Sequence, residues 1–531
     1  MKRLLKQFSL IVALLLLSVC AWSADYLTYN DFEIRRVFQT TGQGNNYDAI
    51  LRIRLMKDTE NPVLLNQITV ELTDEAFKNV GQLHVYMTEN PEFYAVENPQ
   101  IVSWVVPKKK EVKMRIKDNV YIGKNTYLWL TCRVKNNAVI GETIDAGIKQ
   151  VVLQQNKVRM VVGLPKQDGY LQGQGLKIFK QQQFLFVPTT FNCRFYRIPA
   201  MVLDRKGNII VAADCRYDSN GDLGEHKIDV AVRRSEDNGR TWTKQQIVAK
   251  GDGVSSDAFG YGDAALVRTN TGRIVCIMAA GKNNFFKGMR NIGITVSDDD
   301  GKTWTEPREL TANSFTDAVH CLTDSLGFWS IFATSGKGLC LPDGRILFAA
   351  NCISMDGTYN IDCYILSSED NGESWTLGPQ CAYKGCDESK LELMNDGSLL
   401  LSVRQDGDRG FNKGGYDAGS WQQQWRTSDM SGNACNADML YYSREIDGEK
   451  DIILHTLCNS PERKNLTLYK STDKGRTWQE MMNIQRGGAA YSTMIKLPNG
   501  DVAVFYEDDS YSAGNGYHLN YIVIAKEQIV F

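Results

Sequence analysis

The chain has 531 residues, which at ~150 residues per domain leaves room for two to four domains and excludes a single small one. Hydrophobic residues make up 43% of the sequence and charged residues 23%, a composition typical of a soluble globular protein with a sizeable core. The 60 basic and 62 acidic residues give a net charge of −2, so no global positive field exists that would hold nucleic acid. We therefore expect no nucleic-acid partner, and any anionic ligand must meet a local cluster of basic side chains.

The first residues are typical of an export signal. Basic residues precede an apolar stretch over about 8–19, which is too short to cross a bilayer, and the small residues of an Ala-Trp-Ser segment follow. We therefore predict a signal peptide over 1–24 and an exported protein that is periplasmic, secreted or held at the cell surface. The segment 17–20 resembles a bacterial lipobox, but Val19 is large where a small residue is expected, so a lipoprotein is the second alternative. No later segment is a transmembrane candidate.

The chain has 13 cysteines, and their positions favour buried thiols over a disulfide framework. Several, such as Cys276 and Cys352, lie in apolar strand-like runs, where a thiol packs as a small hydrophobe. Cys381 and Cys386 could pair, although burial is favoured. No CxxC pair or zinc-type spacing occurs, so we expect no metal site and no cofactor.

Residues 25–175 are expected to form a first domain with a β-sandwich fold. Runs such as 49–55, 67–72 and 127–131 alternate between apolar and polar residues with period 2, and Gly, Asn and Asp separate them. The pattern then loosens into a Gly- and Gln-rich linker, and a second domain starts near Phe184.

The role of this first domain is open between two interpretations: it binds carbohydrate, or it only spaces the second domain. Binding would require exposed aromatic side chains, for which the candidates are Tyr86, Phe93 and Trp104. Aromatic residues in strands are usually part of the core, which favours the spacer.

An eight-residue pattern containing Ser, Asp, Gly and Trp occurs four times in the second domain. The copies span 235–242, 297–304, 368–375 and 471–478. Each follows a β-rich run, and its Ser and Asp oxygens can accept backbone N–H bonds while Gly supplies a positive φ, so each is predicted to be a turn. The interval between the third and fourth copies is long enough to hide a copy that has lost the pattern. We therefore expect an all-β chain in which 184–531 form a six-bladed β-propeller, with seven blades as a crowded alternative.

The four octapeptides resemble the Asp boxes of sialidases, where they lie away from the active face and stabilise the blades. Further motifs, in the family's order, extend this resemblance. Arg197 lies in an Arg-Ile-Pro motif that resembles the segment of the family's first arginine. Glu388 and Arg404 flank two strands joined by an Asn-Asp-Gly turn, which lets both reach the same propeller mouth. Arg463 resembles the third arginine, an assignment made less secure by Arg444 nearby.

The remaining site residues are also assigned by resemblance. Asp222 lies in a loop similar to the one that carries the family's acid/base aspartate, and Tyr491 lies in a segment similar to that of the nucleophilic tyrosine. Glu507 resembles the glutamate that supports the first arginine. Arg216 and Asp263 lie in loops expected at the same mouth and are weaker candidates for substrate contact. His226 lies near Asp222 and could tune it, although a surface position is favoured. Taken singly, any of these residues is more often a surface charge, a turn residue or core packing.

The resemblance implies a retaining exo-α-sialidase that acts on sialylated glycans or glycoproteins. Three arginines would bind the carboxylate of sialic acid, and a neutral phenol would avoid the repulsion that a carboxylate nucleophile would meet there. Tyrosine nucleophiles are a known exception among glycosidases. Glu388 would take the proton of Tyr491, and Asp222 would protonate the leaving oxygen and then activate water. The alternatives are a sialic-acid lectin on the same propeller and a trans-sialidase. The sequence departs from the family pattern at Tyr196, where Phe is common, and in the region 421–436, which lacks a clean Asp box.

Overall fold

The structure is a computed structural model. It describes residues 27–37, 40–59, 61–94, 96–164, 174–224, 226–253, 258–288, 291–310, 328–354, 360–432, 434–443, 451–510 and 516–530. Strands dominate this part of the chain, so the predicted all-β class is confirmed. No helix within these ranges is long and apolar enough to cross a membrane. The predicted signal peptide over 1–24 and the alternative arginine Arg444 lie outside the described residues.

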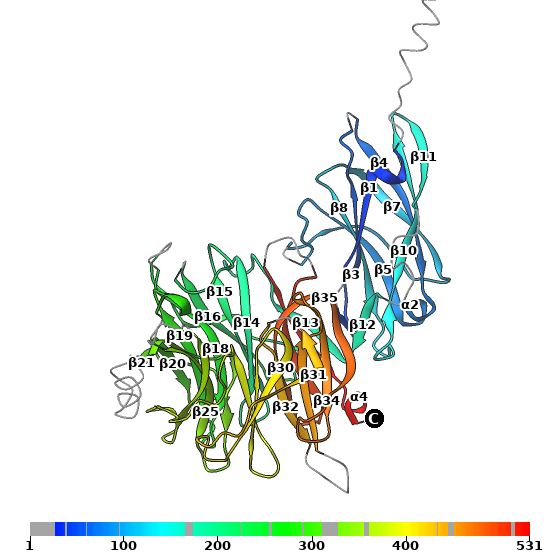
Figure 1. Ribbon diagram of the computed structural model, residues 1–531. Coiled ribbons are helices and arrows are strands. Elements are labelled where there is room, and N and C mark those ends of the chain that lie inside the picture. The colour runs from blue at the N-terminus through cyan, green and yellow to red at the C-terminus, as the bar shows by residue number, and fades with distance from the viewer. Residues whose placement is uncertain are drawn as a thin grey trace, which may run out of the picture.

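The first body is a pair of antiparallel sheets that pack face to face (Figure 1). One sheet has the strand order β1 (Phe32–Arg36), β3 (Asp48–Leu55), β8 (Tyr127–Val134), β5 (Val80–Thr88) and β6 (Gln100–Val105). The other has the order β11 (Val158–Gly163), β10 (Ala146–Gln155), β4 (Val63–Leu72) and β7 (Glu111–Ile122). The short helices η1 (Tyr29–Asp31) and α2 (Asp74–Asn79) accompany them. Alternate side chains of both sheets form one apolar core, as the period-2 pattern predicts.

Two of the three aromatic residues considered as exposed binding residues are core residues instead. Tyr86 is 8% exposed and Phe93 is 4% exposed, and their ring centres lie 5.4 Å apart. The expectation of exposure is wrong for both, because Tyr86 lies opposite the buried Trp129 of β8 and Phe93 packs on the same cluster. Trp104 is 48% exposed, and the Lys117 ammonium lies 5.0 Å from the centre of its ring.

A small sheet lies where the first body meets the second. It consists of β2 (Thr40–Gly42), β12 (Leu176–Phe179) and β9 (Thr143–Ile144), and β13 (Gln181–Phe186) follows directly and pairs with a strand of the second body. Figure 1 labels β12 and β13 at this junction. Side chains bond across it: Asn45 Nδ2 donates to Gln182 Oε1 at 2.8 Å, and Asn520 Nδ2 donates to Thr40 Oγ1 at 3.0 Å. We propose the division into domains over 25–175 and 184–531 on this basis.

The strands of the second body fall, within the described residues, into six groups, which are antiparallel except for the parallel pairing of β23 with β18. The first group is β14 (Phe195–Leu203), β15 (Ile209–Arg216), β16 (Ile228–Ser235) and β17 (Gln246–Ala249). The second is β18 (Gly260–Arg268), β19 (Ile274–Gly281), β20 (Asn291–Ser297) and β21 (Arg308–Leu310), with β23 (Gly336–Lys337) at its edge. The third is β22 (Phe328–Ala333), β25 (Ile346–Ser354), β26 (Ile361–Ser368) and β27 (Thr376–Leu377), with β24 (Leu339–Cys340) paired to β25. The fourth is β28 (Ser389–Leu393), β29 (Leu399–Val403), β30 (Gly407–Gly414) and β31 (Trp425–Gly432). The long strand β35 (Gln479–Lys496) then joins the last two groups: β32 (Asp438–Ser443), β33 (Ile452–Cys458) and β34 (Lys464–Ser471) on one side, and β36 (Val502–Asp508), β37 (His518–Ile524) and β13 on the other. The short helices η3 (Phe285–Lys287) and α4 (Glu527–Val530) complete the elements. The β-propeller class is confirmed, whereas the count of six blades, with β13 closing the last one, stays a prediction.

The Asp boxes are turns held by their own side chains. In the first copy, Asp237 Oδ1 accepts from the backbone N–H groups of Arg240 and Thr241 at 3.0 and 2.8 Å. Trp242 Nε1 donates to the carbonyl of Gly239, whose φ is +82°. The other three copies repeat these bonds.

A fifth turn of the same kind lies in the fourth blade, within the interval where the sequence predicts a hidden copy. Asp417 accepts from the N–H groups of Gly419 and Ser420, and Trp421 Nε1 donates to the carbonyl of Ala418. Ala418 takes the place of glycine with φ +57°. This turn is one residue shorter than the others, which hides it from the eight-residue pattern.

The cysteines of the described segments are free thiols. Cys386 is buried and Cys381 is half-buried.

Candidate active site

The first arginine of the site is aimed by a distortion of β14. The pairing of β14 with β15 is irregular between Arg197 and Ala200, and Ile198 has φ +60°. A β-branched residue avoids this region of φ and ψ, so the surrounding structure must stabilise it. Glu507 does so, because its Oε1 accepts from Ile198 N at 2.8 Å and from Arg197 Nε at 2.6 Å. Such bulges redirect side chains beside active sites.

Glu388 and Arg404 are brought together by the hairpin of β28 and β29. Glu388 precedes β28 and Arg404 follows β29, and the N–H of Arg404 donates to the carbonyl of Glu388 at 2.8 Å. Arg404 Nη1 donates to Glu388 Oε2 and to the Tyr491 hydroxyl, both at 2.8 Å. Arg404 Nε lies 3.2 Å from Asp387 Oδ2. One guanidinium therefore links the candidate base and the candidate nucleophile.

All three predicted arginines surround the ring of Tyr491. Their guanidinium carbons lie 5.3 Å (Arg197), 5.9 Å (Arg404) and 5.5 Å (Arg463) from the ring centre. The Tyr491 residue is 8% exposed, so the ring forms part of the floor of the site. Burial and the negative charge on Glu388 raise the pKa of the phenol well above its usual value. The phenol is therefore neutral at physiological pH.

Glu507 ties two of these residues into one rigid unit. It is fully buried, and besides its bonds to Arg197 and Ile198 its Oε2 accepts from the N–H of Tyr491 at 3.1 Å. Three donors thus surround one carboxylate, which is the arrangement that keeps a buried charge stable.

Arg216 is the last residue of β15, and Asp222 lies on the loop that follows this strand. Arg216 is fully buried, and its Nη1 donates to Asp222 Oδ1 at 2.9 Å and to the carbonyls of Asn220 and Gly221. Its other edge binds the buried Asp214. The buried Arg216 therefore holds the loop that carries Asp222 in place, whereas the Asp222 side chain itself is 71% exposed at the mouth of the site.

Nearby arginine charges control the pKa of Asp222. Desolvation by the surrounding walls favours the neutral acid, but the charges of Arg216 and Arg197 outweigh it, and the pKa of Asp222 lies below its usual value. Arg463 acts in the same direction. The unliganded site therefore holds Asp222 as a carboxylate.

Asp263 is a second carboxyl group at this mouth. It lies at an irregularity in β18 with φ +56°, and its N–H donates to Asp214 Oδ1 at 3.0 Å. Burial and the negative charges of Asp214, Asp222 and Glu388 raise the pKa of Asp263 well above its usual value. Its carboxyl group is therefore harder to ionise than that of Asp222. His226, expected on the surface, is 2% exposed, so that expectation is wrong.

Three polar residues that hold Glu388 are missing from the sequence-based assignment. Ser335 Oγ donates to Glu388 Oε1 at 2.8 Å, and Asn436 Nδ2 donates to the same oxygen at 3.1 Å. Lys390 Nζ donates to Asn436 Oδ1 at 2.8 Å, and Lys390 is 1% exposed. The sequence gives little signal for them, because Lys390 lies in β28 with Ser389 and Glu392 as further polar residues.

This network explains why Glu388 is ionised although it is only 2% exposed. Burial favours its neutral form, but the charges of Arg404 and Lys390 outweigh burial, and the pKa of Glu388 is lowered. Burial also lowers the pKa of Lys390, to about 8. A carboxylate that is ready to accept a proton therefore lies against a neutral phenol.

Comparisons with known proteins identify the family of this chain. The family model described as "BNR repeat-like domain" matches residues 217–504. A sialidase of Micromonospora viridifaciens is 28% identical over 336 residues, which cover 59% of this chain and 50% of that protein. A sialidase of Bacteroides fragilis is 23% identical over 496 residues, which cover 88% of this chain and 85% of that protein.

A solved structure, the Hadza microbial sialidase Hz136, has the same fold, with a TM-score of 0.67 and 21% identity over 94% of this chain and all of that chain. The intramolecular trans-sialidase of Ruminococcus gnavus aligns with 66% of this chain and 98% of its own, with a TM-score of 0.54 and 17% identity. The chain therefore belongs to the BNR repeat-like family, and its recognition as a sialidase-type chain is confirmed.

Proposed function

We propose that the protein is a retaining exo-α-sialidase that hydrolyses terminal sialic acid from glycans. The observation that carries this proposal is the convergence of three guanidinium groups on one buried phenol that is itself bonded, through Arg404, to a buried carboxylate. Sialic acid carries a carboxylate on its anomeric carbon, so an anion site beside the nucleophile matches this sugar.

Arg197, Arg404 and Arg463 bind the substrate carboxylate in this proposal. Guanidinium forks stay charged at any working pH and can hold a carboxylate at two points. Three cations so close together repel one another, and the buried charge of Glu507 offsets that repulsion at Arg197. Bound in this way, the anomeric carbon lies over the hydroxyl of Tyr491.

Tyr491 attacks the anomeric carbon while Glu388 accepts the phenolic proton. Arg404 Nη1 donates to the phenol oxygen, so it stabilises the negative charge that develops there as the proton leaves. A glycosyl-tyrosine intermediate forms and the bond to the leaving oxygen breaks. Water then attacks from the opposite face, and two inversions give net retention.

Asp222 donates the proton to the leaving oxygen and later accepts one from water. The unliganded site holds Asp222 ionised because the arginines attract its charge. A bound substrate carboxylate neutralises part of that arginine charge and raises the pKa of Asp222. The substrate thus loads its own general acid with the proton that cleavage requires.

Turnover of a fluorogenic sialoside, with the product followed by NMR, tests this function. We expect release of sialic acid with the α configuration first, and loss of nearly all turnover in Tyr491→Phe with retained ligand binding. Near-normal activity of Tyr491→Phe would remove Tyr491 from its role. Binding of sialic acid without turnover by the wild type would favour the lectin, and transfer to a sugar hydroxyl or formation of an anhydro sugar would favour a trans-sialidase.

The place of action follows from the same proposal. Sialylated glycans and glycoproteins lie outside the cytoplasm, and the predicted signal peptide over 1–24 would deliver the enzyme to them.

A further inference from the structure

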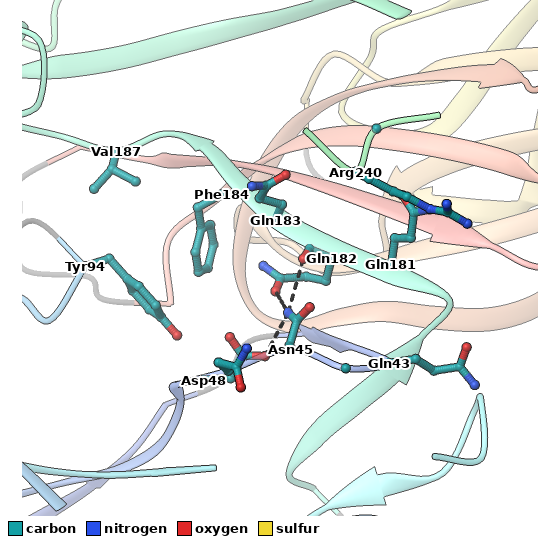
Figure 2. Close-up of a pocket in the computed structure, with 13 residues that line it drawn as sticks. Gln43, Asn45, Asp48, Tyr94, Gln181, Gln182, Gln183, Phe184, Val187 and Arg240 are labelled. Carbon is teal, nitrogen blue, oxygen red and sulfur yellow. Dashed lines mark hydrogen bonds between the residues drawn. The ribbon is translucent and has the colours of Figure 1, made fainter. Parts of the chain in front are cut away.

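A polar pocket of about 580 Å³ lies between the two bodies of the molecule, formed by residues that take no part in the candidate active site. Asn45, Asp48 and Tyr94 come from the sandwich side, and the start of β13 and Arg240 come from the propeller side. Figure 2 shows Tyr94 and Phe184 at one end and Gln181 with Arg240 at the other. Pockets of this size at domain interfaces are common ligand sites.

The back wall of the pocket is rigid because its polar groups bond to one another across the junction. Asn45 Nδ2 donates to Asp48 Oδ2 at 3.0 Å and to Gln182 Oε1 at 2.8 Å. Gln182 Nε2 in turn donates to Asn520 Oδ1 at 2.9 Å, and Thr41 donates to Asp48. The carboxylate of Asp48 is therefore already bonded within the wall, and these bonds hold the lining side chains in place.

Other polar groups of the pocket keep hydrogen-bonding capacity. Gln181 Oε1 is buried and has no partner among the described residues. Gln43 uses its amide N–H₂ on the carbonyl of Ala138, which leaves its oxygen. Within the described part of the chain, neither the Gln183 side chain nor the Arg240 guanidinium has a bonded partner. A buried acceptor without a partner is costly, so the pocket has a demand for a donor.

An aromatic surface borders these amides. The rings of Tyr94 and Phe184 lie 4.9 Å apart, and the Phe184 ring lies 5.2 Å from the ring of His518. The apolar surface of these rings can pack on C–H groups of a ligand, and the nearby amide groups can bond to hydroxyl groups at its rim. The pocket therefore suits a ligand with one apolar face and several hydroxyl groups. Arg240 is the one cation among the lining residues, compared with three arginines at the candidate active site.

We propose that this interdomain pocket binds an uncharged saccharide unit, a hexose or an N-acetylhexosamine of a glycan chain. Glutamine amides both donate and accept, so they can match vicinal hydroxyl groups, and the aromatic rings pack on the face of the pyranose. The choice of a glycan sugar rests on the proposed function, whereas the pocket and its unpaired amides do not. The site requires both bodies, so an isolated sandwich over 25–175 lacks it.

Ligand-observed NMR on the full-length chain tests the proposal, with N-acetyllactosamine and lactose as probes. A sialic-acid transition-state mimic is added to fill the candidate active site, so that any remaining signal comes from elsewhere. We expect saturable binding in the millimolar range that the mimic does not displace. Absence of saturation transfer at high probe concentration would overturn the proposal, and so would displacement by the mimic.

Matched variants locate the binding. Gln183→Ala with Arg240→Ala should weaken binding by about 3- to 10-fold for each hydrogen bond lost, and Gln181→Ala should do the same alone. The control is Gln423→Ala with Lys302→Ala, because Gln423 is exposed on another blade and Lys302 occupies the equivalent position of another Asp box. Binding that survives the pocket variants, or falls equally in the control, would place the saccharide elsewhere and contradict the proposal. Turnover of a small fluorogenic sialoside should be unchanged in all of these variants. If the wild type showed no turnover, the proposed enzymatic function would be refuted, but the result for saccharide binding in the pocket would still stand.

Discussion

Replacement of Glu507 by glutamine tests how the site is held together. The carboxylate is fully buried and accepts from Arg197 Nε, Ile198 N and Tyr491 N. Glutamine keeps the shape but has one acceptor oxygen, so if that oxygen serves Arg197 and Ile198, its N–H₂ group faces the N–H of Tyr491. The variant therefore removes the charge opposite a buried guanidinium and leaves a buried donor unpaired.

The magnitudes follow from these contacts. Breaking a buried ion pair on one side costs about 3–5 kcal/mol of stability. Loss of a charge-assisted hydrogen bond that orients Arg197 costs a further ~1.5–3 kcal/mol in transition-state binding, which is about 10- to 100-fold in kcat/KM. Urea unfolding at neutral pH and steady-state kinetics on a fluorogenic sialoside measure the two effects separately.

The control for this variant is Glu462→Gln. The Glu462 carboxylate is 75% exposed and pairs with Lys464 beside Arg463, so it changes the charge near the cluster without breaking a buried contact. It should alter neither stability nor kinetics measurably. If Glu507→Gln were as stable as the wild type to within about 1 kcal/mol and kept kcat/KM within about twofold, the assignment of Glu507 as the support of Arg197 would be wrong.

Three further predictions test other parts of the site. Lys390→Met should move the acid limb of kcat/KM to higher pH, because the lysine charge lowers the pKa of Glu388; an unmoved limb would show that Lys390 only packs. Asp222→Asn should lower kcat about 10²- to 10⁴-fold on natural sialosides and far less on an aryl sialoside with an acidic phenol, whereas equal losses on both would argue against a general acid. Burial lowers the pKa of His518 from 6.5 to about 3, so this residue stabilises the fold above pH 6.5 and the stabilisation is lost as the pH falls toward 3. In His518→Phe, the slope of the urea-unfolding free energy against pH should therefore fall by about 1.4 kcal/mol per pH unit between these two pH values. An unchanged slope would contradict the lowered pKa of His518.

The parts of the fold that the sequence predicts are those set by local chemistry. An Asp box forms from hydrogen bonds within five residues, so its pattern is visible in the chain. The turn at Asp417 makes similar bonds but lacks one residue, and only its position after β30 identifies it. The proximity of Glu388 and Arg404 could be predicted for the same reason, because a single hairpin brings these two residues together.

The parts that the sequence does not predict depend on contacts between blades. Ser335, Lys390 and Asn436 lie on different segments and meet only when the propeller closes around Glu388. Tyr86 and Phe93 are likewise buried in a cluster with Tyr127 and Trp129 that is separate from the sandwich core, and the alternation of a single strand does not predict this second cluster. The interdomain pocket requires both bodies and leaves no pattern in either.

Trapping with 2,3-difluorosialic acid tests the central claim most directly. The fluorine next to the anomeric carbon slows hydrolysis of the glycosyl-enzyme, so the nucleophile stays labelled and can be found by mass spectrometry of the digested protein. We predict one adduct, on Tyr491, that disappears in Tyr491→Phe and decays slowly with return of activity. An adduct on Glu388 or Asp222, or full turnover of substrate with no adduct at all, would contradict a mechanism in which a phenol among three arginines attacks the sugar.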